Sequence, residues 1–275
     1  MIAPIAKVIT EKNIIILSPH YDDVPLIFGG YLDSLVTNQL IHTKNIRIIQ
    51  IFSFSNFMTR DDEGNKDISM KRVEYVTGIR LIEDTKCLND LIGHGNYSYE
   101  IKGENECLLR QKEAIFEGPI EFLSGDKDSF DEEDWRVYER LKNNAHEWLI
   151  SEDTAILLPL GVKEHIDHIV LREAVMDAKK ELGHKTNAII YFGEDQPYTG
   201  LADSSDWDKA KAFLNELPVT PLNYCIDEKR KADLSMKYYA SQAEESYRDG
   251  VLSRADQLKQ KYGSDTGVER MYRLV

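Results

Sequence analysis

The sequence has few cysteines, no long apolar run and a deficit of positive charge. Its three cysteines, Cys87, Cys107 and Cys225, are far apart, which excludes a disulfide framework and a CxxC metal knuckle. No segment approaches the roughly 18–20 consecutive apolar residues of a membrane span, and Met1–Lys7 lacks the apolar core of a signal peptide. These absences predict a protein of the reducing cytoplasm whose cysteines serve packing or have no special role.

Acidic residues outnumber basic ones, and the formal net charge is -14 at pH 7. Nucleic-acid binding needs clustered Lys and Arg, and an anionic membrane surface would repel this charge, so both partners are disfavoured. A neutral or weakly polar small molecule is compatible with it. The hydrophobic content of 42% and the charged content of 30% are ordinary for a globular protein.

Short apolar segments alternate with segments of helical periodicity. Such alternation predicts βαβ units and an α/β fold with a mainly parallel sheet flanked by helices. We expect one domain over 1–275 with a loop-rich insertion at 93–131 near the mouth of the site, and we assign no element at 200–224. Strands are predicted at 14–18, 45–53, 86–91, 155–160 and 187–192. Helices are predicted at 24–39, 68–82, 167–181 and 227–248, and from a capped start at 129–134 to about 149.

The first apolar run ends in a histidine and two carboxylates. Four apolar residues, 14–17, suit a strand buried on both faces, and Pro19 is followed by His20, Asp22 and Asp23. The C-terminal end of such a strand is where open α/β sheets place their chemistry. An aspartate before a helix also commonly caps it, so this turn alone leaves helix capping open as an alternative.

Two histidines with an aspartate between them follow a later apolar run. After 155–160 come His165, Asp167 and His168, which lead into a segment of helical spacing. Positions i and i+3 share a helix face, so both histidines can point at one object. Chance or surface histidines would explain this pair by itself. Asp167 could orient one of the imidazoles from behind.

Together the two motifs predict a catalytic metal site at the ends of two parallel strands. Catalytic zinc typically has three protein ligands and one open position, and His20, Asp23 and His168 would supply two nitrogens and one oxygen. The metal would lower the pKa of its water and polarise a carbonyl. Asp22 would then be free to take a proton, and His165 to stabilise an oxyanion or protonate a leaving amine.

These motifs resemble the signatures of a known family. Residues 18–23 with Gly29-Gly30 resemble the PHxDD…GG signature of the PIG-L/LmbE-like deacetylases, and residues 165–168 resemble their HxDH signature. The resemblance implies a Rossmann-like fold and a divalent metal, usually zinc, that serves removal of an acetyl or acyl group from an amino-sugar nitrogen. It implies ligand roles for His20, Asp23 and His168, a general base in Asp22, an electrostatic or acid role for His165, and support of His165 by Asp167.

Weaker matches extend the resemblance over roughly 14–242. Arg72 lies in an R-x-E pattern, Asp195 and Tyr198 lie in an E-D-x-P-Y pattern, and a later helix ends in S-Q. Arg72, Asp195 and Tyr198 are therefore candidate substrate contacts. The alternatives are a surface ion pair for Arg72 and a structural turn for the other two. Val24 stands where many members have Glu, the segment 93–131 matches nothing, and the acidic stretch 126–134 is expected at the surface.

The sequence thus predicts a cytoplasmic, metal-dependent hydrolase that deacylates an amino sugar or glycoconjugate. Zn²⁺ is the expected cofactor, with Fe²⁺ or another divalent metal as the alternative, and homo-oligomerisation is left open. One rival is a Rossmann-type nucleotide-binding protein, against which the lack of GxGxxG after the first strand counts. The other rival is a metal-binding or degenerate, non-catalytic protein of the same fold.

Overall fold

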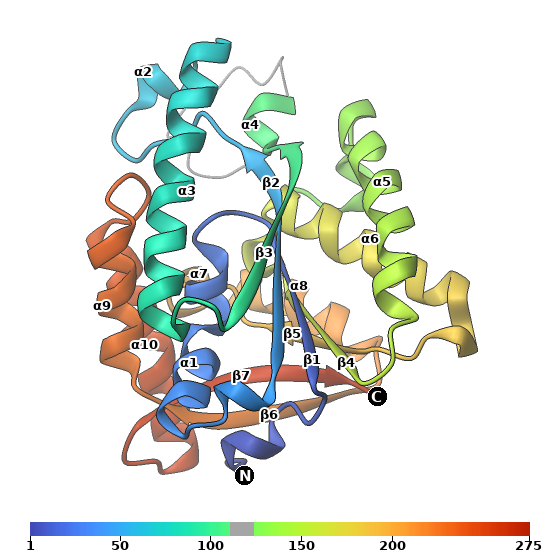
Figure 1. The fold of residues 1–275 in the computed structure, drawn as a ribbon, viewed down its shortest axis with the longest axis vertical. Coiled ribbons are helices and arrows are strands. Elements are labelled where there is room, and N and C mark those ends of the chain that lie inside the picture. The colour runs from blue at the N-terminus through green and yellow to red at the C-terminus, as the bar shows by residue number, and fades with distance from the viewer. Residues whose placement is uncertain (111–123) are drawn as a thin grey trace.

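A mixed sheet of seven strands forms the centre of the computed structural model, which describes residues 1–110 and 124–275 (Figure 1). The strand order is β3-β2-β1-β4-β5-β7-β6. The first five strands are parallel, and β7 is antiparallel to β5 and β6. This arrangement confirms the predicted Rossmann-like α/β fold. The strands are β1 (Asn13–Ser18), β2 (Asn45–Phe54), β3 (Tyr97–Asn105), β4 (Thr154–Pro159), β5 (Ile189–Gly193), β6 (Val219–Ile226) and β7 (Gly267–Leu274).

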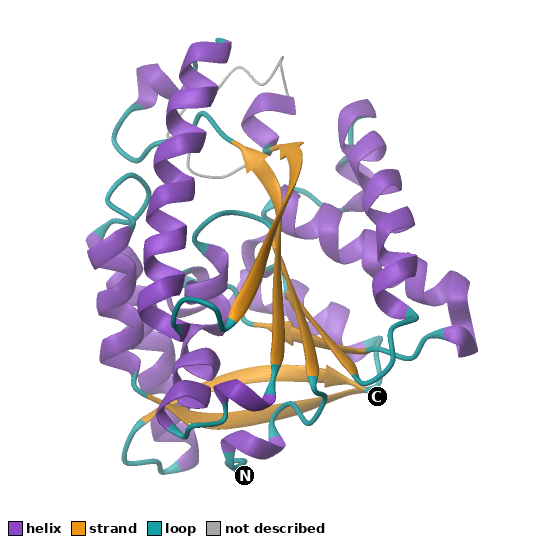
Figure 2. Ribbon diagram, in the orientation of Figure 1, coloured by secondary structure: helices purple, strands orange, loops and turns teal. Residues whose placement is uncertain are grey.

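Helices cover both faces of the sheet (Figure 2). In β1, Ile14 and Ile16 belong to one core and Ile15 and Leu17 to the other, which explains the unbroken apolar run. The first core includes α1 (Asp23–Thr37), α3 (Met70–Ile92), α9 (Glu228–Tyr238) and α10 (Glu245–Tyr262). The second includes α5 (Glu132–Leu149), α6 (Ile166–Leu182) and α8 (Ser204–Asn215). The remaining α-helices are single turns: α2 (Asp62–Asn65), α4 (Cys107–Arg110) and α7 (Tyr198–Leu201).

The strand predicted at 86–91 is wrong. Helix α3 continues to Ile92, because Cys87, Leu88 and Leu91 prolong its buried face. The third strand is β3, inside the segment predicted to be a loop-rich insertion. Its residues are half-buried or exposed. Tyr97, Tyr99 and Ile101 alternate with polar residues as in a strand, but the glycines and charged residues around them favour the loop interpretation. The segment also contains α4, and its residues 111–123 lie outside the described residues.

The single helix predicted over 227–248 is two helices, α9 and α10. The chain turns inward between them, where Tyr239, Ser241 and Gln242 are buried. The unassigned segment 200–224 contains α8 and most of β6, which pairs with β7 at one edge of the sheet. In the described parts of the chain no helix is long and apolar enough to cross a membrane.

The topology brings three loops together at one end of the sheet. Strands β1, β4 and β5 are parallel neighbours, so the segments that follow them leave the sheet side by side. These segments are 19–22 after β1, 160–165 after β4 and 194–197 after β5. They hold His20, Asp22, His165 and Asp195, and Asp23, Asp167 and His168 lie in the first turns of the helices that follow.

Candidate metal centre

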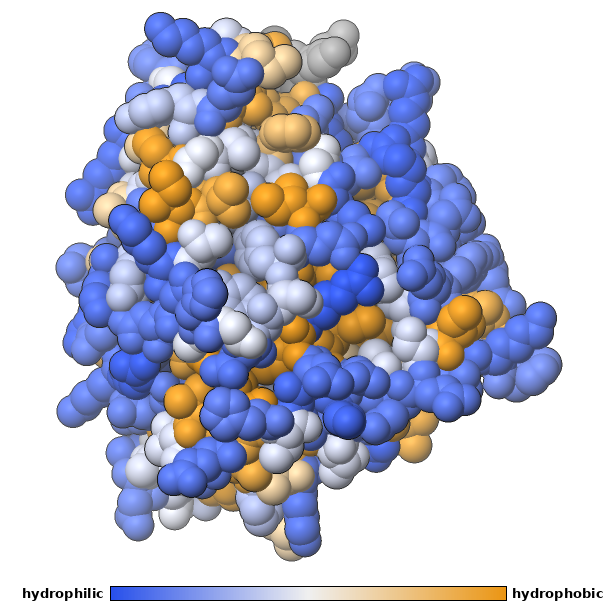
Figure 3. Space-filling view, viewed as in Figure 1, coloured by the Kyte–Doolittle hydropathy of each residue, from blue (hydrophilic) through white to orange (hydrophobic). Residues whose placement is uncertain are grey.

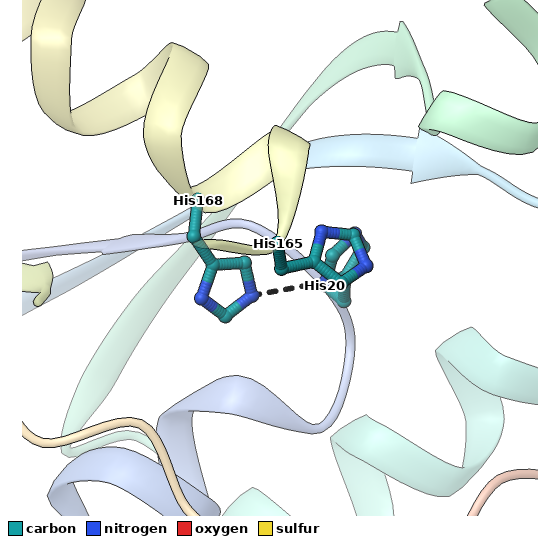
Figure 4. Close-up of side chains that lie close together, drawn as sticks. All are labelled: His20, His165 and His168. Carbon is teal, nitrogen blue, oxygen red and sulfur yellow. Dashed lines mark hydrogen bonds between the residues drawn. The ribbon is translucent and has the colours of Figure 1, made fainter. Parts of the chain in front are cut away.

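Three side-chain atoms lie at the corners of a nearly equilateral triangle. His20 Nδ1 and Asp23 Oδ2 are 3.3 Å apart, His168 Nε2 and Asp23 Oδ2 are 3.3 Å apart, and the two histidine nitrogens are 3.4 Å apart. All three side chains are buried, and Figure 4 shows the His168 ring directed at His20. Ligands at 2.0–2.1 Å from a tetrahedral zinc ion lie about 3.4 Å apart. The predicted ligand residues are therefore spaced as three ligands of one ion.

A carboxylate lies behind each histidine of the triangle. His20 Nε2 is 2.8 Å from Asp167 Oδ2, and His168 Nδ1 is 2.6 Å from Asp195 Oδ1. A ring nitrogen that donates to a carboxylate leaves the other nitrogen unprotonated and able to bind a metal. Both imidazoles thus present their second nitrogen to the centre of the triangle. Arg110 forms an ion pair with Asp167 at 2.6 Å.

The electrostatics of the triangle favour positive charge. Burial lowers the pKa of His20, but the hydrogen bonds that its ring donates to the carboxylates of Asp167 and Asp23 outweigh this effect and raise the pKa to about 9. The pKa of His168 is likewise raised well above its ordinary value, against burial, by Asp23 and Asp195. The pKa of Asp23 is lowered, although burial opposes this, chiefly because of His168. A divalent cation at the triangle would be stabilised by the same carboxylates that stabilise the protonated histidine rings.

Asp22 lies beside the triangle rather than in it. It occupies the N-cap position of α1, yet its side chain makes no capping hydrogen bond, so the structure does not support the capping interpretation. Its carboxylate is 14% exposed and lies 4.0 Å from Arg80 Nη2. Burial and the charge of Asp23 raise its pKa, against the effect of Arg80. A carboxylate whose pKa is raised toward neutrality can accept and return a proton.

His165 is held beside the two other histidines (Figure 4). Its ring centroid is 4.7 Å from that of His20 and 5.0 Å from that of His168. The backbone N–H of Asp167 donates to His165 Nδ1 at 3.2 Å. Burial and then the neighbouring histidines hold its pKa well below the ordinary value. His165 is therefore neutral near pH 7 and can carry its proton on Nε2.

The turn before His165 is conformationally strained. Gly161, Lys163 and Glu164 have φ values of 83°, 65° and 56°, and only glycine adopts that region without steric cost. Asp195 Oδ2 accepts the N–H groups of Gly161 at 2.8 Å and Val162 at 3.0 Å. One carboxylate thus fixes both His168 and the turn that leads to His165.

The structure places the three candidate substrate contacts differently. Tyr198 is near Asp22: burial, Tyr247 and then the Asp22 charge raise its pKa. Asp195 is fully buried and turned toward His168, so its carboxylate presents no surface to a substrate. Arg72 binds the carbonyl of Asn56 at 3.1 Å and forms an ion pair with Asp61 at 2.8 Å. These contacts match the ion-pair alternative for Arg72. Through them Arg72 stabilises the segment 56–65.

Sequence reasoning missed the arginine that approaches Asp22. Arg80 is buried on α3, two turns beyond Arg72, and contacts Glu106 at 3.0 Å and Gln242 at 2.7 Å. The sequence signal for Arg80 is a charged residue among the apolar residues of 73–82. Two further expectations need correction. Asp167 holds His20 rather than His165 through its carboxylate, and Asp134, expected at the surface, is fully buried and bound to Arg110.

Cys107 and the Gly29-Gly30 pair lie outside the triangle. Cys107 lies within 4.8 Å of His165 and Asp167, and burial raises the pKa of its thiol well above the ordinary value. Gly30 is packed tightly, because a Cβ there would lie 2.4 Å from Glu269 Oε2. The Gly29-Gly30 pair lies within α1 and therefore serves packing rather than phosphate binding.

Comparison with solved structures gives the same fold. No protein-family model and no curated protein matches the chain. The A40926 pseudoaglycone deacetylase Dbv21 superposes with a TM-score of 0.59 at 18% identity, covering 96% of this chain and 97% of that one. The zinc-inhibited form of teicoplanin deacetylase Orf2 gives 0.61 at 14% identity, with coverages of 96% and 98%. N,N'-diacetylchitobiose deacetylase from Pyrococcus horikoshii gives 0.54 at 12% identity, with coverages of 97% and 89%. The chain shares the fold of these deacetylases, as the motif resemblance implied.

Proposed function

We propose that the chain is a metal-dependent N-deacetylase of the PIG-L/LmbE type that acts on an amino sugar or glycoconjugate. The triangle of His20 Nδ1, Asp23 Oδ2 and His168 Nε2 carries the proposal, because its sides of 3.3–3.4 Å suit one divalent cation. The names of the structural neighbours, which are deacetylases of a glycopeptide pseudoaglycone, teicoplanin and diacetylchitobiose, support the reaction class.

Two histidines and one carboxylate suit Zn²⁺, which is the metal we expect, although Fe²⁺ accepts the same ligands. A divalent metal held by them would supply an acidified water and polarise the substrate carbonyl. The chain's own residues would supply the remaining chemistry. Asp22, with its raised pKa, would accept the proton of the attacking water and return it to the amine as the C–N bond breaks.

His165 would stabilise the developing oxyanion. Because its Nδ1 accepts the Asp167 N–H, the proton of the neutral ring lies on Nε2, which can donate a hydrogen bond. Its lowered pKa makes it a poor source of protons for the amine, so we favour the electrostatic role over the acid role. Asp167 and Asp195 would orient His20 and His168, and Tyr198 and Arg80 would line the approach to Asp22.

The test combines metal analysis with turnover. The purified chain should contain about one equivalent of zinc or iron and release amine from at least one member of a panel of N-acetyl amino sugars. Removal of the metal by a chelator should abolish release, and its return should restore it. Bound metal without turnover on any panel member would favour the non-catalytic alternative, and absence of metal affinity would contradict the site itself.

Two further proposals concern the whole chain. We propose that residues 1–275 form one domain, since all seven strands belong to one sheet. We also keep the cytoplasmic location expected from the sequence. Limited proteolysis tests the first proposal, because a single domain should resist cleavage between its strands, and fractionation of the producing cells tests the second.

A further inference from the structure

Strand β3 is an open edge of the sheet. Within the described residues, it pairs only with β2, and no strand lies beyond it. In Figures 1 and 2 this edge faces the viewer, between α3 and α5. An open edge presents unpaired N–H and C=O groups that can accept another strand.

Exposed apolar side chains flank this edge. Ile101 on β3 is 47% exposed, and Phe54, which lies 3.6 Å from the Cβ position of Gly103, is 44% exposed. On α3, Tyr75 and Ile82 are 60% and 54% exposed. Figure 3 shows apolar residues gathered over this face. Such clustering is typical of an interaction surface.

The helix residues lie on the side of α3 next to β3. Tyr75, Ile82 and Asn89 are spaced by seven residues, so they share one side of the helix. The Tyr97 hydroxyl of β3 donates to Asn89 Oδ1 at 3.2 Å. The side of α3 that bears Tyr75 and Ile82 therefore borders the edge strand.

The charges on β3 are complementary to those of a second copy of β3 that runs antiparallel to it. Glu100 and Lys102 flank Ile101, so an antiparallel copy centred on Ile101 places Glu100 opposite the partner's Lys102, twice by symmetry. Centring the pair on Glu100 would oppose two glutamates, and centring it on Lys102 would oppose two lysines. Like charges directly opposite are destabilising, so only the register about Ile101 avoids repulsion among these three.

We propose that the β3 edge is a self-association surface on which a second copy of the chain pairs antiparallel about Ile101. Charged residues on an edge strand usually discourage pairing. Here Glu100 and Lys102 disfavour pairing with other strands but are compatible with antiparallel pairing to β3 of a second copy. The contact is isologous, so it closes as a two-fold dimer with one continuous sheet. A two-fold axis normal to the sheet keeps each α3 on the same face, where Tyr75 and Ile82 extend the apolar contact.

Analytical ultracentrifugation of the full chain over a concentration series tests the association. A monomer–dimer equilibrium is expected. Ile101→Asp would place two carboxylates opposite each other and should weaken the dimer at least tenfold, about 1.4 kcal/mol. Ile150→Asp is the matched control, because Ile150 is 49% exposed at the end of α5, outside the surface. Unfolding by urea checks that both variants remain folded.

Disulfide trapping tests the register. In a Cys225→Ser background, Ile101→Cys should form a covalent dimer on mild oxidation, since only this register sets residue 101 opposite itself at about 4.5–5.5 Å between Cβ atoms. Ser98→Cys, which lies three residues from the centre of this pairing and therefore does not face itself, should not. A chain that stays monomeric over the whole series, an Ile101→Asp variant that associates like the wild type, or equal cross-linking of both cysteine variants would overturn the proposal. None of these readouts depends on deacetylase activity.

Discussion

Replacing Asp195 with asparagine should weaken metal binding without unfolding the protein. Asp195 Oδ1 lies 2.6 Å from His168 Nδ1, and Oδ2 accepts two backbone N–H groups of the Gly161–Val162 turn. Asparagine has one acceptor oxygen in place of two. If that oxygen keeps the two backbone donors, the amide NH₂ faces His168 and forces the proton of the ring onto Nε2, where it blocks the metal.

The alternative orientation of the asparagine is also unfavourable. Turning its oxygen toward His168 leaves two buried backbone N–H groups without an acceptor, at about 1–3 kcal/mol each. The first orientation is therefore favoured, and in that orientation the substitution weakens metal binding. Loss of such a supporting carboxylate typically reduces metal affinity 10–100-fold, equivalent to about 1.4–2.7 kcal/mol.

Competition with a zinc-binding fluorophore measures this affinity, and urea unfolding in the presence of a chelator measures the stability of the metal-free protein. Asp208→Asn is the control, because it removes the same charge from an exposed position on α8 that pairs only with Lys211 among the described contacts. A variant that is folded and binds zinc as tightly as the wild type would refute the assignment of Asp195 to His168.

Three other perturbations test separate parts of the structure. Asp22→Asn should retain full metal occupancy but lose at least about 100-fold in turnover, as measured by metal content and amine release; full turnover would remove Asp22 as the base. Burial raises the pKa of Asp84 from 3.8 to about 8, so the folded state favours its proton and stability should fall as pH rises from about 4 to 8. Asp84→Asn should flatten that dependence in urea unfolding at several pH values, and a parallel wild-type profile would contradict the shift. Gly30→Ala should destabilise by about 1–3 kcal/mol, because its Cβ would lie 2.4 Å from Glu269, whereas Gly29→Ala, with 3.7 Å of room, should not.

Four of the strands inside the sheet could be predicted from the sequence, whereas β7, whose apolar residues are interrupted by Glu269, Arg270 and Arg273, could not. Strands β1, β2, β4 and β5 lie inside the sheet and therefore appear as apolar runs. The edge strands β3 and β6 are half-buried or exposed at most positions, so neither appears as a continuous apolar run. The alternation of Tyr97, Tyr99 and Ile101 in β3 is a strand signal, but it stands among glycines and charged residues that favour a loop. The strand predicted at 86–91 is wrong because this short segment, with Cys87, Leu88 and Leu91 as its apolar residues, does not distinguish a strand from the end of a helix.

The residues of the site also differ in how far the sequence alone can predict them. His20, Asp22 and Asp23 form one local motif, and His165 and His168 another, so each is visible in a short stretch of sequence. The contacts that orient them join distant segments: Asp195 is 27 residues from His168, and Asp167 is 147 residues from His20. Nothing local distinguishes a carboxylate that faces substrate from one that supports a histidine, which is why Asp195 was grouped with the substrate contacts.

The supporting carboxylates also explain how one site can be stable with and without its metal. Asp23, Asp167 and Asp195 converge on His20 and His168 and raise the pKa values of both rings, so the metal-free site favours their protonation. A divalent cation would supply positive charge at the same place. The repulsion between carboxylates is therefore offset in both states. Metal affinity must consequently fall as pH falls, because protons and metal compete for the same nitrogens. Asp22 stands outside this exchange, which leaves its carboxylate available to move a proton during the reaction.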